Sequence, residues 1–342
     1  MAADLRAAAT AASADAPLVT IDDVRRAAST LQGVAIRTPL VPFGPSSARQ
    51  FLKAESLQPI GAFKIRGAYV AVASLPPDVR SRGVITYSSG NHAQGVARAA
   101  RLLGAPAVVV MPSDAPALKR ARVEADGAEV VIVGPSSDER QRVAEALADE
   151  RGLAIIPPFD DDRIIAGQGS VGLEIVEDLP DVAAVLVPIG GGGLASGVAV
   201  AVKAIAPGAR VIGVEPELAA DARDSLREGH IVRWSSEDVS RTIADGTRTT
   251  ALGRRTFAHL SRLLDDVVTV TEAEIAAGVR LAAEQSRLVA EPSGAVAVAA
   301  LAFRAAEAGI GAGGRPVVAI VSGGNVDPDR YRSYLEAAIP DR

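Results

Sequence analysis

The stretch Ala184-Val-Leu-Val-Pro-Ile-Gly-Gly-Gly-Gly193 decides how this sequence folds. Its first six residues form an apolar, β-branched run typical of a buried strand, and the segment Ala195–Ile205 after the glycines has helical period. Strands and helices alternate in this way from Gly83 onward. Such alternation predicts an α/β fold of parallel sheets covered by helices, with ligands at the carboxyl ends of the strands.

The same alternation defines the other expected elements. Strands are expected at Val84–Thr86, Ala107–Met111, Val130–Val133, Ile155–Ile156, Ala184–Ile189, Val211–Glu215 and Pro316–Val321. Helices are expected at Ala93–Leu103, Ala115–Ala125, Asp138–Arg151, Ala195–Ile205 and Glu272–Ala290.

The composition is that of a folded, globular chain. Its 342 residues suit two lobes or one large α/β body, with 48% apolar residues, 23% charged residues and a net charge of −5. No dense Lys/Arg stripe with interleaved aromatics occurs, so no nucleic-acid partner is expected. Apolar runs such as Ala295–Phe303 are shorter than the roughly 20 residues of a membrane-spanning helix, and the N-terminus lacks a signal peptide's apolar core. We expect a cytoplasmic protein without membrane association.

Cysteine is absent, which excludes disulfides, Cys-based zinc sites, iron–sulfur clusters and thiol nucleophiles. The three histidines, His92, His230 and His259, form no H-E-x-x-H pattern. Zinc hydrolysis therefore has no visible ligand set.

Three glycine-containing polar loops follow predicted strands. They are Ser88-Ser-Gly-Asn-His92, Gly190–Gly193 and Ser322-Gly-Gly-Asn325, and we expect them to open toward one crevice. The tetraglycine precedes a helix, so its amides and the helix N-terminus can surround a phosphate. A tight turn is the alternative, but four glycines lose more backbone entropy than a turn requires, which favours anion binding.

The glycine loop also fits a dinucleotide fingerprint. Gly190, Gly192 and Ala195 satisfy G-x-G-x-x-A after a strand, and Glu215 ends the next strand where a ribose-binding acid belongs. A nicotinamide-dependent oxidoreductase is therefore one open alternative. It leaves the other two loops unexplained.

One lysine stands in an unusual setting. Lys64 follows Phe63 in an apolar stretch and is flanked by Gly61 and Gly67. Desolvation lowers the pKa of such an amine and makes it a usable nucleophile and base. A surface lysine on an amphipathic helix is the alternative.

Taken together and in this order, GAFKIRGA, SSGNHAQG, GGGGL and SGGN resemble the fold-type II family of pyridoxal-phosphate enzymes, and within it the threonine/serine dehydratase and serine racemase branch. The resemblance covers Val19 to Val326. It implies a tryptophan synthase β-like α/β fold with two lobes, each with a helix-covered, mostly parallel sheet. The implied lobes are a large cofactor-binding lobe of residues 1–76 plus 160–342 and a small mobile lobe of residues 77–159, in a homodimer.

The resemblance assigns the cofactor contacts by motif. The implied cofactor-binding residues are Phe63, Lys64, Asn91, Gly190, Gly191, Gly192, Gly193 and Ser322. Lys64 would hold pyridoxal phosphate as a Schiff base, with Phe63 beside the ring, Asn91 on the 3-hydroxyl and the glycines around the phosphate. Ser322 would face the pyridine nitrogen. A neutral hydroxyl there makes the ring a weaker electron sink than an Asp would, which favours elimination of a β leaving group.

The resemblance also assigns substrate contacts. They are Ser88, Asn91, His92, Arg140, Asp245 and Thr249. Arg140 resembles an arginine that closes over an acidic substrate, and a solvated helix arginine is the alternative. Ser89 would lie across the cofactor plane from Lys64 and exchange a proton on the opposite face, so Lys64 and Ser89 are the expected catalytic residues.

The segment Val214–Asp221 resembles the divalent-cation segment of serine racemase-like members. The carboxylates of Glu215 and Asp221 and the carbonyl of Ala219 would bind Mg²⁺ or Ca²⁺, completed by water. Acids at an ordinary helix N-terminus are the alternative.

The implied activity is that of a carbon–oxygen lyase. A dehydratase of this type converts L-threonine, L-serine or a related 3-hydroxy amino acid to a 2-oxo acid and ammonia, and Lys64 would remove the Cα proton. Serine racemase and threo-3-hydroxyaspartate dehydratase are alternatives within the family, and a non-catalytic ligand-binding protein is a further one.

Two features depart from the family pattern. Ile60 stands where the family usually has Thr, which removes a hydroxyl near the Schiff base. The chain ends soon after Ser322, so we expect no C-terminal regulatory domain and a catabolic, effector-independent role.

Overall fold

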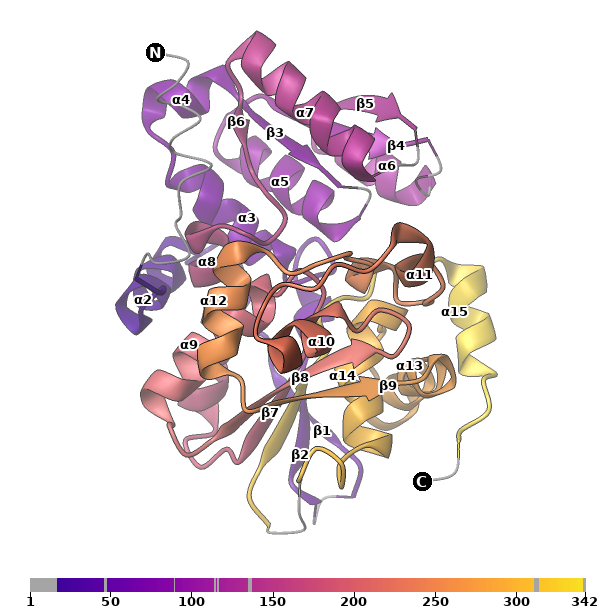
Figure 1. Ribbon diagram of the computed structural model, residues 1–342. Coiled ribbons are helices and arrows are strands. Elements are labelled where there is room, and N and C mark those ends of the chain that lie inside the picture. Colours follow the sequence, from indigo (N-terminus) through magenta and orange to yellow (C-terminus); the bar gives the residue numbers. More distant parts are fainter. Residues whose placement is uncertain are drawn as a thin grey trace.

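Two sheets with helices packed on their faces carry the fold (Figure 1). The computed structural model describes residues 17–45, 48–88, 90–113, 115, 117–134, 137–310 and 314–340. The larger sheet has the order β1-β2-β10-β7-β8-β9 and the smaller one β5-β4-β3-β6. Among the described pairings only β1 with β2 is antiparallel. The predicted α/β fold with two mostly parallel sheets is confirmed.

The strands are β1 (Leu40–Phe43), β2 (Gln50–Lys53), β3 (Val84–Tyr87), β4 (Ala107–Pro112), β5 (Glu129–Val133), β6 (Ala154–Ile155), β7 (Ala184–Pro188), β8 (Arg210–Pro216), β9 (Asp266–Val270) and β10 (Val317–Ile320). The helices are α2 (Ile21–Thr30), α3 (Lys64–Ala73), α4 (Pro77–Arg82), α5 (Asn91–Leu102), α6 (Ala117–Ala125), α7 (Ser137–Arg151), α8 (Asp162–Asp178), α9 (Gly193–Ile205), α10 (Asp221–Glu228), α11 (Ser236–Ser240), α12 (Arg254–Leu263), α13 (Glu272–Ser286), α14 (Pro292–Phe303) and α15 (Pro328–Leu335), with 3-10 turns η2 (Glu55–Leu57) and η3 (Asp245–Thr247).

The small sheet is built entirely from strands β3 to β6, and the larger sheet takes strands from both sides of them along the chain. The upper part of Figure 1 shows the small sheet with α5, α6 and α7, set apart from the larger sheet below. The division into a large lobe of residues 1–76 plus 160–342 and a mobile small lobe of residues 77–159 stays a prediction.

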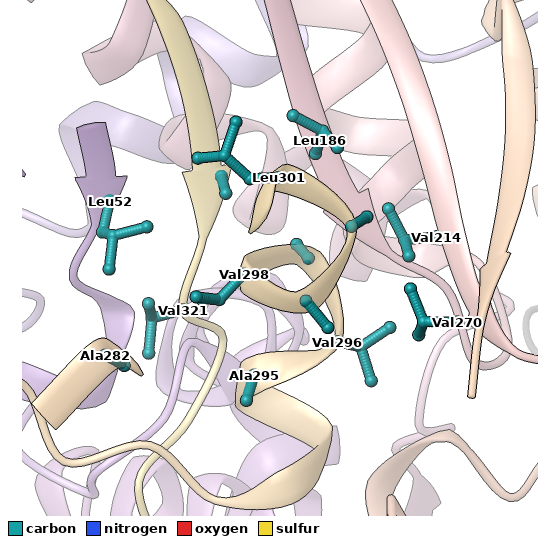
Figure 2. Close-up of a cluster of buried hydrophobic side chains, with 14 of the residues drawn as sticks. Leu52, Leu186, Val214, Val270, Ala282, Ala295, Val296, Val298, Leu301 and Val321 are labelled. Carbon is teal, nitrogen blue, oxygen red and sulfur yellow. The ribbon is translucent and has the colours of Figure 1, made fainter. Parts of the chain in front are cut away.

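Helix α14 lies at the centre of the largest apolar cluster. Residues Pro292–Leu301 are all buried, and Figure 2 shows side chains of α14 such as Val296 and Leu301 facing Leu186 and Val214 from the strands. A helix that is apolar on every side has no amphipathic period. That explains why the sequence pattern did not predict α14.

Most of the expected boundaries differ from the observed ones by one or two residues, and one helix differs by four. The predicted helix Glu272–Ala290 ends at Ser286, because Arg287 adopts a left-handed conformation with φ 60° that turns the chain back toward α14. The strand expected at Ile155–Ile156 is Ala154–Ile155. No helix in the described part of the chain is both long and apolar enough to cross a bilayer.

Candidate active site

The three glycine-containing loops come off the carboxyl ends of strands in both sheets. Gly190–Gly193 and Ser322–Asn325 follow β7 and β10, which pair directly in the larger sheet, and Ser88–His92 follows β3 of the small sheet. The side-chain amide of Asn325 donates to Oδ1 of Asn91 at 2.9 Å, which joins the small-sheet loop to the loop after β10. The place where these loops meet, between the two sheets, is that of the expected crevice.

Lys64 begins α3, and its amine contacts the segment between β6 and α8. Nζ donates to the carbonyl oxygen of Pro158 at 2.7 Å and lies 5.2 Å from the centre of the Phe63 ring. Burial lowers the pKa of Lys64 to about 8. No carboxylate compensates for this desolvation in the described contacts, so a sizeable fraction of the amine is neutral at mildly alkaline pH.

The segment around Lys64 is fastened to the loop after β10. The backbone N–H of Phe63 donates to the carbonyl of Ser322 at 3.0 Å, and Ala62 pairs with Gly323 in an isolated bridge. The hydroxyl of Ser322 donates to the carbonyl of Ser293 at 3.3 Å. Ser322 is therefore hydrogen-bonded to the residue that directly precedes α3, although the two are far apart in sequence.

The tetraglycine loop is closely covered by its surroundings. A Cβ on Gly191 would overlap the ring of Phe159, and one on Gly190 would lie 3.2 Å from the carbonyl oxygen of Gly246. Gly192 has φ 89°, a conformation that other residues rarely adopt. Because the loop has no side chains, its groups for binding a ligand are backbone N–H groups at the N-terminus of α9.

Glu291 is a buried carboxyl of the crevice that sequence reasoning missed. Its Oε1 accepts a hydrogen bond of 2.5 Å from the side-chain amide of Asn91. Burial, with a smaller contribution from the charge of Asp245, raises the pKa of Glu291 to about 7. The signal was present in the sequence as a lone acid between Ala290 and Pro292 inside an otherwise apolar run.

An ion pair links the small sheet's helix α6 to the larger sheet's loop at η3. Nζ of Lys119 lies 2.6 Å from Oδ2 of Asp245, and Oδ1 of Asp245 accepts from the hydroxyl of Ser293 at 3.3 Å. Burial alone would raise the pKa of Asp245, but the ammonium of Lys119 outweighs it and the pKa lies below its usual value. Nζ of Lys119 also lies 3.9 Å from the position of a Cβ on Gly90, so this cation borders the loop after β3. No sequence pattern distinguished Lys119 from the other basic residues of its helix.

The remaining expected substrate residues lie around the same crevice. His92 is buried, and its Nε2 donates to the carbonyl of Ile156 at 3.0 Å. Burial, together with the charge of Lys64, lowers the pKa of His92 to about 3, so its ring is neutral. The hydroxyl of Ser88 accepts a backbone N–H of its own loop at 3.2 Å, and that of Thr249 is buried with no partner among the described residues.

Two expected residues have no demonstrated place in the crevice. Arg140 is half-buried in α7, which packs on β3 and β4 of the small sheet. Ser89 lies outside the described residues. The roles assigned to both stay predictions.

Glu215 at the end of β8 and Asp221 at the start of α10 form a pair of buried carboxyls. Both oxygens of Glu215 accept backbone N–H groups, from Ala222 at 3.0 Å and from Arg223 at 2.8 Å. Glu215 thus caps α10 and is not available to a ribose, which removes a support of the dinucleotide interpretation. Both oxygens of Asp221 are buried without a hydrogen-bond partner in the described structure.

Burial raises the pKa of Asp221 to about 7 and, with the charge of Asp221 added, raises that of Glu215 well above its usual value. Two buried carboxyls without a cation are costly to ionise. The described residues contain no group of three or more His, Cys, Asp or Glu side chains suited to a metal. A cation here would therefore also need backbone carbonyl or water ligands, for which the buried Ala219 is a candidate.

The comparisons with known proteins agree with one another. The family described as "Pyridoxal-phosphate dependent enzyme" matches residues 31–323. L-threonine ammonia-lyase of Thermotoga maritima is 42% identical over 314 residues, covering 91% of this chain and 76% of the relative. L-threo-3-hydroxyaspartate ammonia-lyase of Saccharomyces cerevisiae is 39% identical, covering 84% and 86%. The structure of maize serine racemase superposes with a TM-score of 0.87 at 37% identity, covering 94% and 98%.

Proposed function

Because the chain belongs to the family of pyridoxal-phosphate-dependent enzymes and is an ammonia-lyase of the threonine/3-hydroxyaspartate type within it, we propose that it eliminates water from L-threonine or L-serine. Hydrolysis of the released enamine then takes up one water and gives ammonia and a 2-oxo acid. One observation carries this proposal. The amine of Lys64 is held by a carbonyl oxygen, and desolvation lowers its pKa, at the meeting point of three glycine-containing loops.

The residues of the crevice fit pyridoxal phosphate. Lys64 would hold it covalently through Nζ, Phe63 would lie against it, and the N–H groups of Gly190–Gly193 would bind its phosphate. Asn91 and Ser322 would bind the polar atoms of the ring. When bound, this cofactor accepts the electron pair left behind when the Cα–H bond of an amino acid breaks.

Groups of the chain itself would transfer the protons and hold the substrate. Once the amine of the substrate has displaced Lys64 from the cofactor, the freed Nζ would take the Cα proton, because a desolvated amine with a pKa of about 8 is a competent base near neutral pH. The backbone N–H groups of the loop Ser88–His92 would hold the substrate carboxylate, and the neutral ring of His92 would fix that loop through Ile156. Ser89 would act on the opposite face of the substrate, which is the role that racemisation requires.

A substrate with a second carboxylate is the other candidate, and Lys119 supports it. Its ammonium borders the substrate loop at Gly90 and is already neutralised by the carboxylate of Asp245. The second carboxylate of threo-3-hydroxyaspartate could replace that of Asp245 on Lys119, because the side chain of Asp245 is 40% exposed and water can solvate it when it is released. Arg140 would contribute a second cation if the small lobe closes, and Thr249 would face the substrate.

We extend the proposal to a divalent cation and to a homodimer. Mg²⁺ or Ca²⁺ would be held by Glu215, the carbonyl of Ala219 and Asp221, and the two unpartnered oxygens of Asp221 support this site. The homodimer rests on the family alone. Size measurement in solution tests it.

The first experiment is an absorbance spectrum of the purified chain, followed by L-threonine, L-serine and threo-3-hydroxyaspartate with detection of the 2-oxo acid. A near-visible cofactor band and 2-oxo acid formation are expected, and the ranking of kcat/KM identifies the substrate. D-serine formed from L-serine would indicate racemisation. A colourless chain that pyridoxal phosphate cannot reconstitute would contradict the proposal.

A further inference from the structure

Helix α12 takes its N-terminal cap from a distant part of the chain. It starts after Gly253, which has no side chain to accept the first N–H groups. The backbone N–H groups of Arg254, Arg255 and Thr256 donate instead to the carboxylate of Asp160, at 3.1, 2.8 and 3.2 Å. A carboxylate at the positive end of a helix is stabilising, and here it joins two segments more than ninety residues apart.

The contact between Asp160 and α12 depends on the glycine opposite. A Cβ on Gly253 would overlap the carboxyl carbon of Asp160. Any other residue at this position would push the carboxylate away from the three N–H groups. Gly253 and Asp160 thus form a matched pair, because either a side chain at position 253 or the loss of the acceptor oxygens at position 160 would disturb the cap.

Asp160 is attached to the segment that covers the tetraglycine loop. Its chain neighbour Phe159 lies against Gly191 and Gly193, with backbone and side-chain atoms 3.2 Å from the position of a Cβ on Gly193. One residue earlier, the carbonyl of Pro158 accepts the hydrogen bond from Lys64. The cap therefore fixes both the cover of the loop and the acceptor of the reactive amine.

Helix α12 covers the other side of the same loop. Thr256 lies 2.9 Å from the position of a Cβ on Gly192, and Leu252 and Leu260 each lie 3.0 Å from it. The carboxylate of Asp160 thus ties together the two walls between which Gly190–Gly193 is held.

We propose that Asp160 is a positioning residue for the phosphate of the cofactor, acting through its trans cap on α12 to hold Phe159 and α12 against the tetraglycine loop. This rests on the proposed function, in that the loop is taken to bind pyridoxal phosphate. Asp160 touches neither the substrate nor the reacting atoms in this role. It sets the affinity for the cofactor rather than the chemistry.

The test compares Asp160 with its neighbour Asp161, which caps α8 within its own helix by accepting the N–H of Arg163 at 2.8 Å. Full-length holoenzymes of Asp160→Ala and Asp161→Ala are made, and the Kd for pyridoxal phosphate and its rate of loss are measured. Both lose a helix cap, so both unfold at a lower temperature. We expect Asp160→Ala alone to raise the Kd by about tenfold, the factor that a lost cap of typical strength corresponds to.

A conservative variant and a cofactor-free readout separate positioning from general damage. Asp160→Asn keeps an acceptor oxygen of comparable capping strength, so its Kd should stay within about threefold of the wild type. In the cofactor-free chain, hydrogen exchange of residues 159–160 and 190–193 should accelerate in Asp160→Ala and not in Asp161→Ala. An unchanged Kd in Asp160→Ala, or equal changes in both alanine variants, would overturn the proposal.

Failure of the proposed function would look different. A wild-type chain that binds no pyridoxal phosphate would refute the cofactor assignment, and the exchange measurement would still decide whether Asp160 orders the loop. Unchanged exchange of residues 190–193 in Asp160→Ala would overturn the positioning role in that case too.

Discussion

Two groups of ionisable side chains lie on either side of the first turn of α3. One group is paired with opposite charges, and the other has neutral hydrogen-bond partners. On one side, the guanidinium of Arg66 donates to Glu55 at 2.8 Å and to Glu174 at 2.6 Å, and Nζ of Lys53 donates to Glu174 at 2.6 Å. On the other side, Nζ of Lys64 donates to a carbonyl oxygen and Glu291 accepts from the side-chain amide of Asn91, and neither forms an ion pair with a described residue.

The difference shows in the pKa values. Burial would raise the pKa of Glu55, but Arg66 outweighs it and the pKa lies below its usual value, so this group stays charged. Burial lowers the pKa of Lys64 and raises that of Glu291 toward neutrality. Desolvation thus gives a structural charge where counter-charges are supplied and a reactive group where they are withheld.

The largest effect is expected for Lys64→Ala, which removes the amine that has no counter-charge among the described residues. Removing the amine should lower turnover by about 10³-fold or more and abolish the near-visible absorbance, because both need Nζ. Activity assays and an absorbance spectrum check this. The melting temperature should stay near that of the cofactor-free wild type. Retained absorbance would show that another amine holds the cofactor.

On the structural side, Arg66→Met should unfold the chain more easily. The change leaves Glu55 and Glu174 buried without their shared cation, which costs about 3–5 kcal/mol for a buried pair that loses one partner. Urea denaturation measures the loss. A loss below about 1 kcal/mol would mean that water or local rearrangement replaces the guanidinium.

The raised pKa of Glu291 makes the free energy of unfolding depend on pH. Its pKa of about 7 in the folded chain lies above its usual 4.5, so the folded state binds the proton more tightly and stability falls as pH rises between about 5 and 7. Glu291→Gln keeps the hydrogen bond but cannot ionise. The difference in unfolding free energy between wild type and Glu291→Gln should change by about 1–3 kcal/mol across this range. Parallel pH profiles for the two chains would contradict the raised pKa.

Lys119→Gln tests whether the ammonium of Lys119, which is paired with Asp245, also binds a carboxylate of the substrate. It should lower kcat/KM for threo-3-hydroxyaspartate by about tenfold while changing that for L-threonine little, since only the former has a second carboxylate. Asp245→Asn frees the same cation and serves as the matched variant. Equal losses on both substrates in Lys119→Gln would indicate a general role in holding α6 near η3.

The smallest expected effect concerns the carboxyl pair at β8. Millimolar Mg²⁺ or Ca²⁺ should raise the melting temperature of the wild type by a few degrees, because a ligand that binds only the folded chain stabilises it. Asp221→Asn should remove this response. A shift that persists in Asp221→Asn would place the cation elsewhere.

Sequence patterns predicted the parts of the site that lie on the backbone and missed parts that depend on tertiary contacts. The loops at Ser88–His92 and Gly190–Gly193 follow directly from strand ends, so their convergence was predictable. Glu291 belongs to the site only because α13 ends early and the chain turns back. Lys119 belongs to it because two sheets meet, and no local pattern encodes that.

The same reasoning explains the fold. Alternating β-branched strands and amphipathic helices were predicted, whereas α14 was not, since its burial on every side leaves no period to detect. Strands β1, β2 and β9 were also missed, as were helices such as α2, α3, α8 and α12. Strands β1 and β2 are four residues each, and β2 joins the parallel part of the sheet through β10, almost 270 residues later in the chain.

The pairing of β2 with β10 determines which part of the chain can fold first during synthesis. The small sheet uses only residues 84–155 and can pair as soon as those residues leave the ribosome. The larger sheet has β10 between β2 and β7, and the segment carrying Lys64 is bonded to residues 322 and 323, so neither is complete until nearly the whole chain has been made. Contacts this distant in sequence form late. A growing chain therefore exposes an unfinished sheet edge for most of its synthesis and gains its reactive lysine pocket only at the end.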